Sequence, residues 1–113
     1  MTAEDFRTIA LSFDGAVEQA HMGHPDFRAN GRIFATLTAN EESGMVKVPP
    51  EEQIELLRLD GRTFTPASGA WGRQGCTMVR LAGADLPTAR APMTLAWELA
   101  TSVPPPKRRA PKR

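Results

Sequence analysis

The side chains with the most obvious chemical potential are two histidines three positions apart, His21 and His24. Neutral imidazole binds zinc well, but a zinc site needs three or four ligands that converge on one point. These histidines fall at the junction of an expected strand and a turn, and only scattered acids such as Asp26 could join them. The sequence therefore predicts no metal centre, and we expect no cofactor.

A second candidate is the single cysteine, Cys76, which could act as a nucleophile only beside a base. It lies in an expected strand, and the chain has no Cys-His-Asn signature, so we expect a buried and inert thiol. Ser43 and Ser68 fall in loops without the context of a nucleophile elbow. The sequence predicts no catalytic residue, and we expect a protein without enzymatic activity.

The glycine-rich run at residues 69–75 offers binding chemistry instead, because it holds Trp71 and Arg73. Glycines permit a tight, exposed loop, while an indole and a guanidinium can stack on bases and contact phosphates. The alternative is that Trp71 packs over a sheet and Arg73 is simply solvated. No strand precedes a Gly-x-Gly-x-x-Gly pattern here, so a nucleotide-binding fingerprint is absent.

Charge is distributed unevenly along the 113 residues. The last ten residues hold five cations and no acid: Lys107, Arg108, Arg109, Lys112 and Arg113. The rest of the chain holds nine basic residues against 13 acids, a net charge of −4. Prolines and cations cannot build a core, so we expect one domain over residues 1–102 and a disordered tail over residues 103–113. Such a tail binds polyanions whatever its role, and the alternative is a merely solubilising segment.

The elements that must position these residues begin with a β-hairpin around Asn30-Gly31, a pair typical of a type I′ turn. A two-residue loop would pair Arg28 with Ile33 and Phe27 with Phe34. It would also sort the side chains onto two faces: Phe27, Phe34 and Thr36 on one, and Arg28, Ile33, Ala35 and Leu37 on the other. We expect the rings of Phe27 and Phe34 to pack together.

The remaining pattern predicts three helices and further strands. Residues 3–12 form an amphipathic helix capped by Thr2, and a second helix opens at Pro49-Pro50 and stops at a left-handed Gly61. In the second helix Ile54 and Leu57 are expected to face the core. Strands are expected at residues 16–22, 62–65 and 76–81, and a second hairpin over residues 37–48, with its turn at residues 40–44. A last helix follows Asp85, with Leu86 among its core residues and a kink or break at Pro92.

Composition limits the location of the protein. No apolar run approaches the roughly 18 residues that span a membrane. The acidic N-terminus lacks the basic region of a signal peptide. One cysteine excludes an internal disulfide. We expect a cytoplasmic monomer with no membrane partner.

Four stretches resemble the MmcQ/YjbR family of small bacterial proteins: His24-Pro25-Asp26-Phe27-Arg28, Gly31-Arg32-Ile33-Phe34-Ala35, residues 69–77 with Trp71, Gly72 and Gly75, and Ala96-Trp97. The resemblance spans residues 2–102. It implies an α+β fold, a CyaY-like two-layer sandwich whose antiparallel sheet is packed by helices on one side. It also implies a "double wing" in which hairpin loops act as wings, and a DNA-binding label. Pro87, Pro92 and the basic tail depart from the family pattern.

These observations lead to three functional hypotheses. The first is a DNA-binding accessory protein that contacts phosphates through Arg28, Arg32, Lys47 and Arg73, with Trp71 and the five tail cations as further binding residues. The second is a protein- or small-ligand-binding module that uses the grooves beside Trp71, the tail being incidental. The third is binding of iron or another metal, by analogy with the CyaY-like fold. That analogy needs a strongly acidic first helix, and here it offers only Glu4 and Asp5.

Overall fold

The computed structural model describes residues 1–102, so the tail predicted over residues 103–113 lies outside the described residues. The strands form one six-stranded sheet in the order β1-β2-β3-β4-β6-β5, with every neighbouring pair antiparallel. The strands are β1 (Val17–His21), β2 (His24–Ala29), β3 (Arg32–Leu37), β4 (Ser43–Lys47), β5 (Phe64–Pro66) and β6 (Cys76–Arg80). The helices are α1 (Ala3–Leu11), α2 (Pro50–Leu59), α3 (Gly69–Arg73) and α4 (Leu86–Thr101), with a 3-10 turn at Leu81–Gly83. No described helix has the length and apolar character to cross a bilayer.

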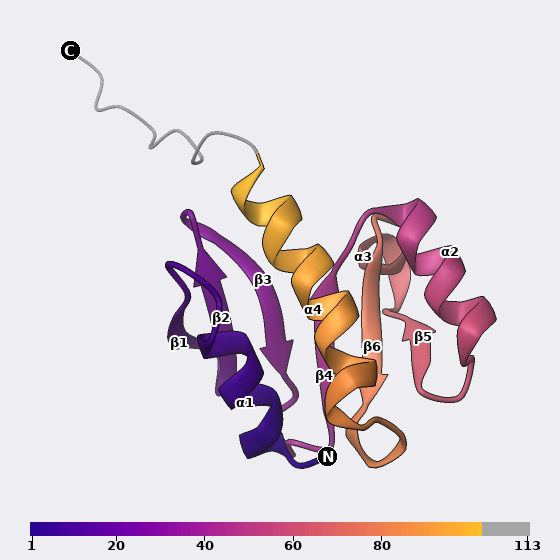
Figure 1. The fold of residues 1–113 in the computed structure, drawn as a ribbon, viewed down its shortest axis with the longest axis horizontal. Helices are drawn as coiled ribbons and strands as arrows, with labels where there is room; N and C mark the ends of the chain where they lie inside the picture. The colour runs from indigo at the N-terminus through magenta and orange to yellow at the C-terminus, as the bar shows by residue number, and fades with distance from the viewer. Residues whose placement is uncertain (103–113) are drawn as a thin grey trace.

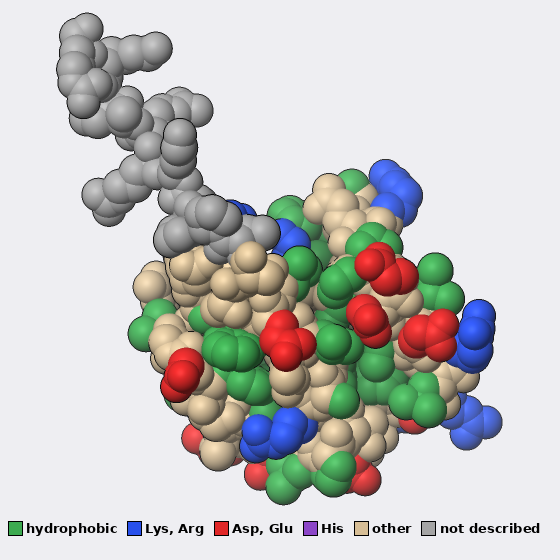
Figure 2. All heavy atoms as spheres, turned by 45° about the horizontal axis from the view of Figure 1, so that its top comes forward, with side chains coloured by type: hydrophobic (Ala, Val, Ile, Leu, Met, Phe, Trp, Pro, Cys, Tyr) green, Lys and Arg blue, Asp and Glu red, His purple; other side chains and the backbone are tan. Residues whose placement is uncertain are grey.

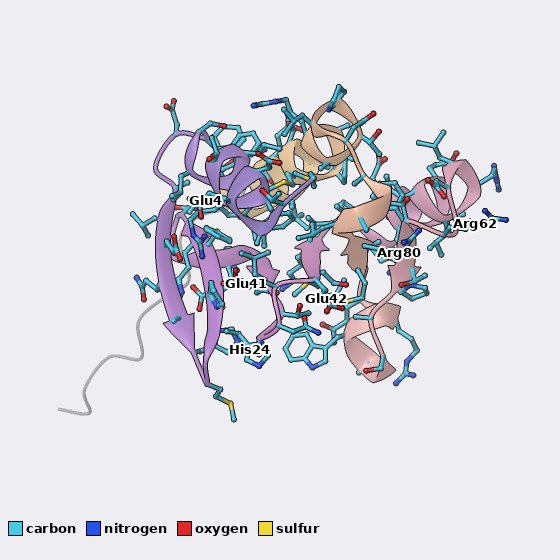
Figure 3. All side chains as sticks on the ribbon, turned by 90° about the horizontal axis from the view of Figure 1, so that it is seen from below. Glu4, His24, Glu41, Glu42, Arg62 and Arg80 are labelled. Atoms are coloured by element: carbon cyan, nitrogen blue, oxygen red, sulfur yellow. The ribbon has the colours of Figure 1, made fainter. Side chains whose placement is uncertain are left out.

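The sheet is covered on one face only. Helices α1 and α4 lie side by side across that face, and α2 lies next to β5 and β6 at one edge (Figure 1). Seen along the sheet, the helical layer lies on one side, while α3 and the β1–β2 hairpin project on the other (Figure 3). The α+β two-layer sandwich expected from the sequence is confirmed.

Aromatic contacts join the first helix to the sheet. Thr2 and Asp5 form a reciprocal capping box that starts α1, as the sequence predicted. The ring of Phe6 packs on Phe27 with centroids 6.0 Å apart, and Phe13 packs edge-on against Phe34 at the same distance. All four rings come from short stretches of sequence, so the N-terminal third of the chain supplies much of the core.

The β2–β3 hairpin has the predicted two-residue turn but not the predicted register. Asn30 and Gly31 have φ values of 56° and 74°, as a type I′ turn requires, and Arg28 faces Ile33. A bulge then inserts Phe34, so Phe27 faces Ala35 instead. The predicted cross-strand pair of Phe27 with Phe34 is therefore wrong. Beyond the bulge the side chains exchange faces, which explains why the core-facing set is Phe27, Ala29, Phe34, Ala35 and Leu37.

Three details of the helices also correct the sequence predictions. Ile54 of α2 is 52% exposed, whereas Gln53 is buried, because α2 turns a different stripe towards the sheet edge. Leu86 is also exposed, at the start of α4. Gly61 is not left-handed, because Asp60 ends α2 in an extended conformation and its carboxylate accepts bonds from the amides of the next turn.

Helix α4 runs through Pro92 without the predicted break. A proline inside a helix costs about 3 kcal/mol, because it removes a hydrogen bond and crowds the preceding turn. Here Ala89, Met93 and Ala96 are buried around it against the sheet, so burial on both sides of the proline offsets that cost.

Candidate functional site

The uncovered face of the sheet holds a groove of about 800 Å³. Its floor is built from outward-facing side chains of β2, β3, β4 and β6. One wall is the tip of the β1–β2 hairpin and the other is the segment that carries α3. Figure 3 shows both walls projecting on the same side of the sheet, with His24 on the hairpin between them. Its lining includes three cations and four apolar side chains: Arg28, Arg32, Lys47, Ile33, Met45, Trp71 and Met78.

Cations gather in this groove without acids. Arg28, Arg32 and Lys47 line it, and no aspartate or glutamate does. Trp71 lines it as well, so four residues predicted from the sequence come together at one site. Arg73 does not line the groove, and the five tail cations lie outside the described residues.

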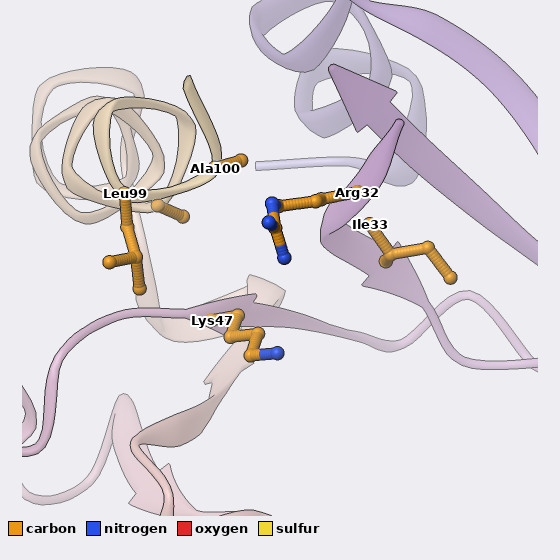
Figure 4. A pocket seen from close by; sticks show the side chains of 6 residues that line it. Arg32, Ile33, Lys47, Leu99 and Ala100 are labelled. Atoms are coloured by element: carbon orange, nitrogen blue, oxygen red, sulfur yellow. The ribbon is translucent and has the colours of Figure 1, made fainter. Parts of the chain in front are cut away.

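A second, smaller hollow of about 200 Å³ continues the cationic end of the groove. Arg32, Ile33 and Lys47 line both hollows, and the end of α4 closes the smaller one. Figure 4 shows Arg32 extending from β3 towards Ala100 and Leu99 of α4, with Lys47 on β4 beneath it. The side-chain amide of Asn30 donates to the carbonyl of Ala100 at 3.0 Å, which fixes the end of α4 to the β2–β3 turn. The last described turn of α4 therefore lies beside Arg32.

Arg28 is positioned by a buried carboxylate below the groove. Asp26 has no exposed surface, and its two oxygens accept from Nε and Nη2 of Arg28 at 2.8 and 3.1 Å. Nδ1 of His21 lies 2.7 Å from the same carboxylate. The Arg28 guanidinium holds the pKa of Asp26 below its usual value, with a smaller contribution from His21, while burial opposes the shift. Lys47, in contrast, makes no ion pair with a described residue.

The two histidines form no recognisable metal centre. Their rings are stacked with centroids 5.9 Å apart, and Asp26 does reach His21, although the sequence placed it only among scattered acids. Its oxygens are already occupied by Arg28. Within residues 1–102, no group of three or more His, Cys, Asp or Glu side chains could hold a metal ion.

Trp71 is 63% exposed and sits on a firmly held support. The predicted glycine-rich loop is the short helix α3, followed by a turn at Gly75 with φ 106°. The side-chain amide of Gln53 donates to the carbonyls of Gly72 and Cys76, at 3.0 Å each. A Cβ on Gly72 would lie 1.9 Å from the carbonyl oxygen of Ala67, so the backbones touch there. Trp71 is neither on an open loop nor packed over the sheet, which are the two arrangements considered from the sequence. It borders the open face of the sheet and stays largely in solvent.

Cys76 is buried at the base of the groove, as the sequence predicted. Burial raises the pKa of its thiol, and the nearby Lys47 ammonium lowers it by less. A thiol held protonated in this way is a poor nucleophile.

The hairpins that the resemblance describes as wings differ in charge. Met22 is 92% exposed at the tip of the β1–β2 hairpin, and the β3–β4 turn carries Glu41 and Glu42. The cationic hairpin is the one between β2 and β3, which carries Arg28 and Arg32. Phosphate contacts therefore fit the β2–β3 hairpin and its surroundings better than the other two tips.

Apart from Asp26, which is buried beneath Arg28, the acids lie mainly on the helices and the turns between strands. Figure 2 shows acidic side chains spread over the helical layer with basic ones among them, and further basic side chains near the end of α4. The net charge of −4 outside the tail thus conceals a groove of the opposite sign.

Sequence reasoning missed the contribution of Met45, Met78 and Gln53 to the site. The alternation of the strands that hold the two methionines was visible in the sequence, but only the β4–β6 pairing shows that Met45 faces Met78. Gln53 gave no signal, since a polar residue near the start of a helix is ordinarily solvated.

Comparison with known proteins gives two findings. A family model described as YjbR matches residues 11–99. The crystal structure of Deinococcus radiodurans protein DR2400, described with the family-model domain DUF419, superposes with a TM-score of 0.76 at 18% identity. The match covers 88% of this chain and 78% of that one, and at this identity it establishes the fold alone. None of the curated proteins matches the chain.

Proposed function

Because the chain belongs to the YjbR family and its cations converge on one groove, we propose that it is a DNA-binding accessory protein without enzymatic activity. The observation that carries this proposal is the groove itself, where Arg28, Arg32 and Lys47 meet Trp71 with no acid among the lining residues. DNA offers regularly spaced phosphates for the cations and flat bases for the indole.

The basic tail belongs to this proposal through its charge. The described chain ends at Ser102, beyond a helix end that is fixed next to Arg32, and the sequence continues with five cations. In this proposal the tail supplies most of the affinity as a polycation, and the groove orients the domain on the strand. Two observations support the absence of enzymatic activity in it: burial raises the pKa of the Cys76 thiol, and His21 lies within hydrogen-bond distance of Asp26.

The test is a titration of DNA binding across salt with full-length variants. Each phosphate neutralised contributes about −0.9 to the slope of log affinity against log salt on duplex DNA. Replacing all five tail cations by glutamine should remove a slope of about −3 to −4.5 and leave a shallower one from the groove.

Lys47→Gln should reduce the slope by a further ~0.9. Its matched control is Arg58→Gln, which removes the same charge from an exposed site on α2 and should leave the slope unchanged. Equal effects of the two substitutions would show that the groove makes no specific contact, and a protein that binds no DNA at low salt would refute the proposal.

One observation favours a second function, the binding of a small ligand or peptide. Ile33, Met45, Met78 and Trp71 give the groove an apolar lining, and about 800 Å³ is a volume typical of ligand sites. Under this alternative the tail is incidental, so glutamine substitution throughout the tail would leave ligand binding intact.

A further inference from the structure

We propose that the groove accepts single-stranded DNA, with a base stacked on Trp71 and the neighbouring phosphates on Lys47 and Arg32. This inference rests on the proposed function and adds which form of DNA the folded domain takes. It follows from the apolar surface in the groove, the arrangement of charge along it and the shape of its walls.

The apolar surface lies where a duplex could not use it. Trp71 is largely exposed, and Met45 and Met78 line the same groove. In a duplex the base faces are stacked on one another and only their edges are accessible. In a single strand every base has a free face, and stacking of that face on an aromatic ring contributes to binding affinity whatever the base sequence. An exposed indole, in a groove that polarisable methionines also line, therefore suits unpaired bases.

The cations lie beside this surface and not across it. Arg32 and Lys47 line the end of the groove next to α4, while Trp71 is carried by the wall that includes Ser68. A single strand laid along the groove would place its backbone at the cationic end and turn its bases towards the indole.

The walls disfavour a duplex on the floor of the groove. The β1–β2 hairpin projects beyond the sheet with Met22 at its tip and brings no cation there to meet a phosphate. The turn between β3 and β4 presents Glu41 and Glu42. A wide, uniformly charged cylinder would reach these projections before it reached the floor, whereas a flexible strand can pass between them.

The experiment compares three ligands on the full-length protein by fluorescence anisotropy: a labelled dT strand of about 12 nucleotides, the same strand paired with dA, and an abasic strand of equal length. The titration with the dT strand is repeated at several salt concentrations. We expect the dT strand to bind roughly 10-fold more tightly than either the duplex or the abasic strand.

Variants at Trp71 test the stacking directly. Trp71→Ala should weaken dT binding by about 10-fold without changing abasic binding, and Trp71→Phe should retain most of the affinity because it keeps an aromatic face. Leu59→Ala, at an exposed site on α2, is the matched control and should change nothing. The exposure of Trp71 means that these variants fold, which circular dichroism verifies.

Intrinsic fluorescence gives an independent measurement. The dT strand should quench the emission of the native protein, and Trp71→Phe should abolish the quenching. The remaining Trp97 stacks on Phe13 away from the groove. Equal binding of duplex and strand, unaffected by Trp71→Ala, would overturn this inference while leaving the proposed function intact. Absence of binding to every DNA ligand at low salt would refute both.

Discussion

Gln53 offers a test of how α3 and its tryptophan are held. Its side-chain amide donates to the carbonyls of Gly72 and Cys76, at 3.0 Å each, from a buried position. A neutral hydrogen bond contributes about 0.5–1.5 kcal/mol net, so the two together contribute about 1–3 kcal/mol. Both carbonyls also accept a backbone amide, from Gly75 and Ala67 respectively, so neither is left without a partner when the glutamine is removed. Alanine favours the helix over glutamine by at most roughly 0.5 kcal/mol, which offsets part of this loss. We expect Gln53→Ala to lower the free energy of unfolding by about 0.5–2.5 kcal/mol.

The adjacent Ile54 is the matched control, because its periodicity predicted a core position. The side chain is 52% exposed. Truncation therefore loses only about half of the roughly 1.5–3 kcal/mol of stability that a fully buried isoleucine side chain contributes. The better helix propensity of alanine offsets part of that loss. Ile54→Ala should therefore lower the free energy of unfolding by only about 0.5–1 kcal/mol.

Gln53→Glu separates hydrogen bonding from packing. Glutamate has almost the same size, but at neutral pH its carboxylate accepts only and would face two carbonyl oxygens. This variant should be at least as destabilised as Gln53→Ala.

The assay is equilibrium unfolding in urea, analysed by linear extrapolation, together with the emission of Trp71 in the folded state. The reasoning is refuted if Ile54→Ala is destabilised as much as Gln53→Ala, or if Gln53→Glu is as stable as the native protein.

Three other predictions concern the hairpin, the buried carboxylate and metals. Gly31→Val should lower the free energy of unfolding by about 1–3 kcal/mol, since a β-branched residue is strained at a φ of 74°; an unchanged melting temperature would contradict this. The pKa of Asp26 is lowered by folding, so its contribution to stability is complete above the unfolded-state pKa of about 3.9 and is lost as pH falls through the lower folded-state value. Asp26→Asn should accordingly flatten the loss of stability in that acidic range in a pH series of thermal melts. Zinc or iron should not raise the melting temperature; a rise of several degrees that is abolished by replacing both His21 and His24 would count against this prediction.

Local chemistry in the sequence was sufficient to predict the start of α1 and the turn between β2 and β3. Thr2 caps α1 and Asn30-Gly31 forms its type I′ turn because the relevant hydrogen bonds and φ values depend on a few adjacent residues. The bulge at Phe34 could not be predicted this way, because the ring of Phe34 packs on Phe13, a contact that depends on how distant segments of the chain meet.

The candidate site was predictable only in its parts. Arg28 and Arg32 share a hairpin, so their proximity follows from the sequence. Lys47 and Trp71 join them only through the pairing of β4 with β6, which are not consecutive strands. Pairings of that kind depend on the packing of the whole sheet, and composition carries little information about them.

Acids outnumber cations on the helical layer, whereas cations gather in the groove, so the molecule has an electric dipole moment. A polyanion that approaches the helical layer would be repelled and would rotate the protein before contact, whereas one that approaches the groove would be drawn in. The fraction of encounters that begin in the right orientation would then rise as salt is removed, more steeply than a net charge of +1 suggests. By the same reasoning, retention on a cation-exchange resin would follow the face presented to the resin and not the isoelectric point, so the protein would stay bound above its sequence pI of about 8.0.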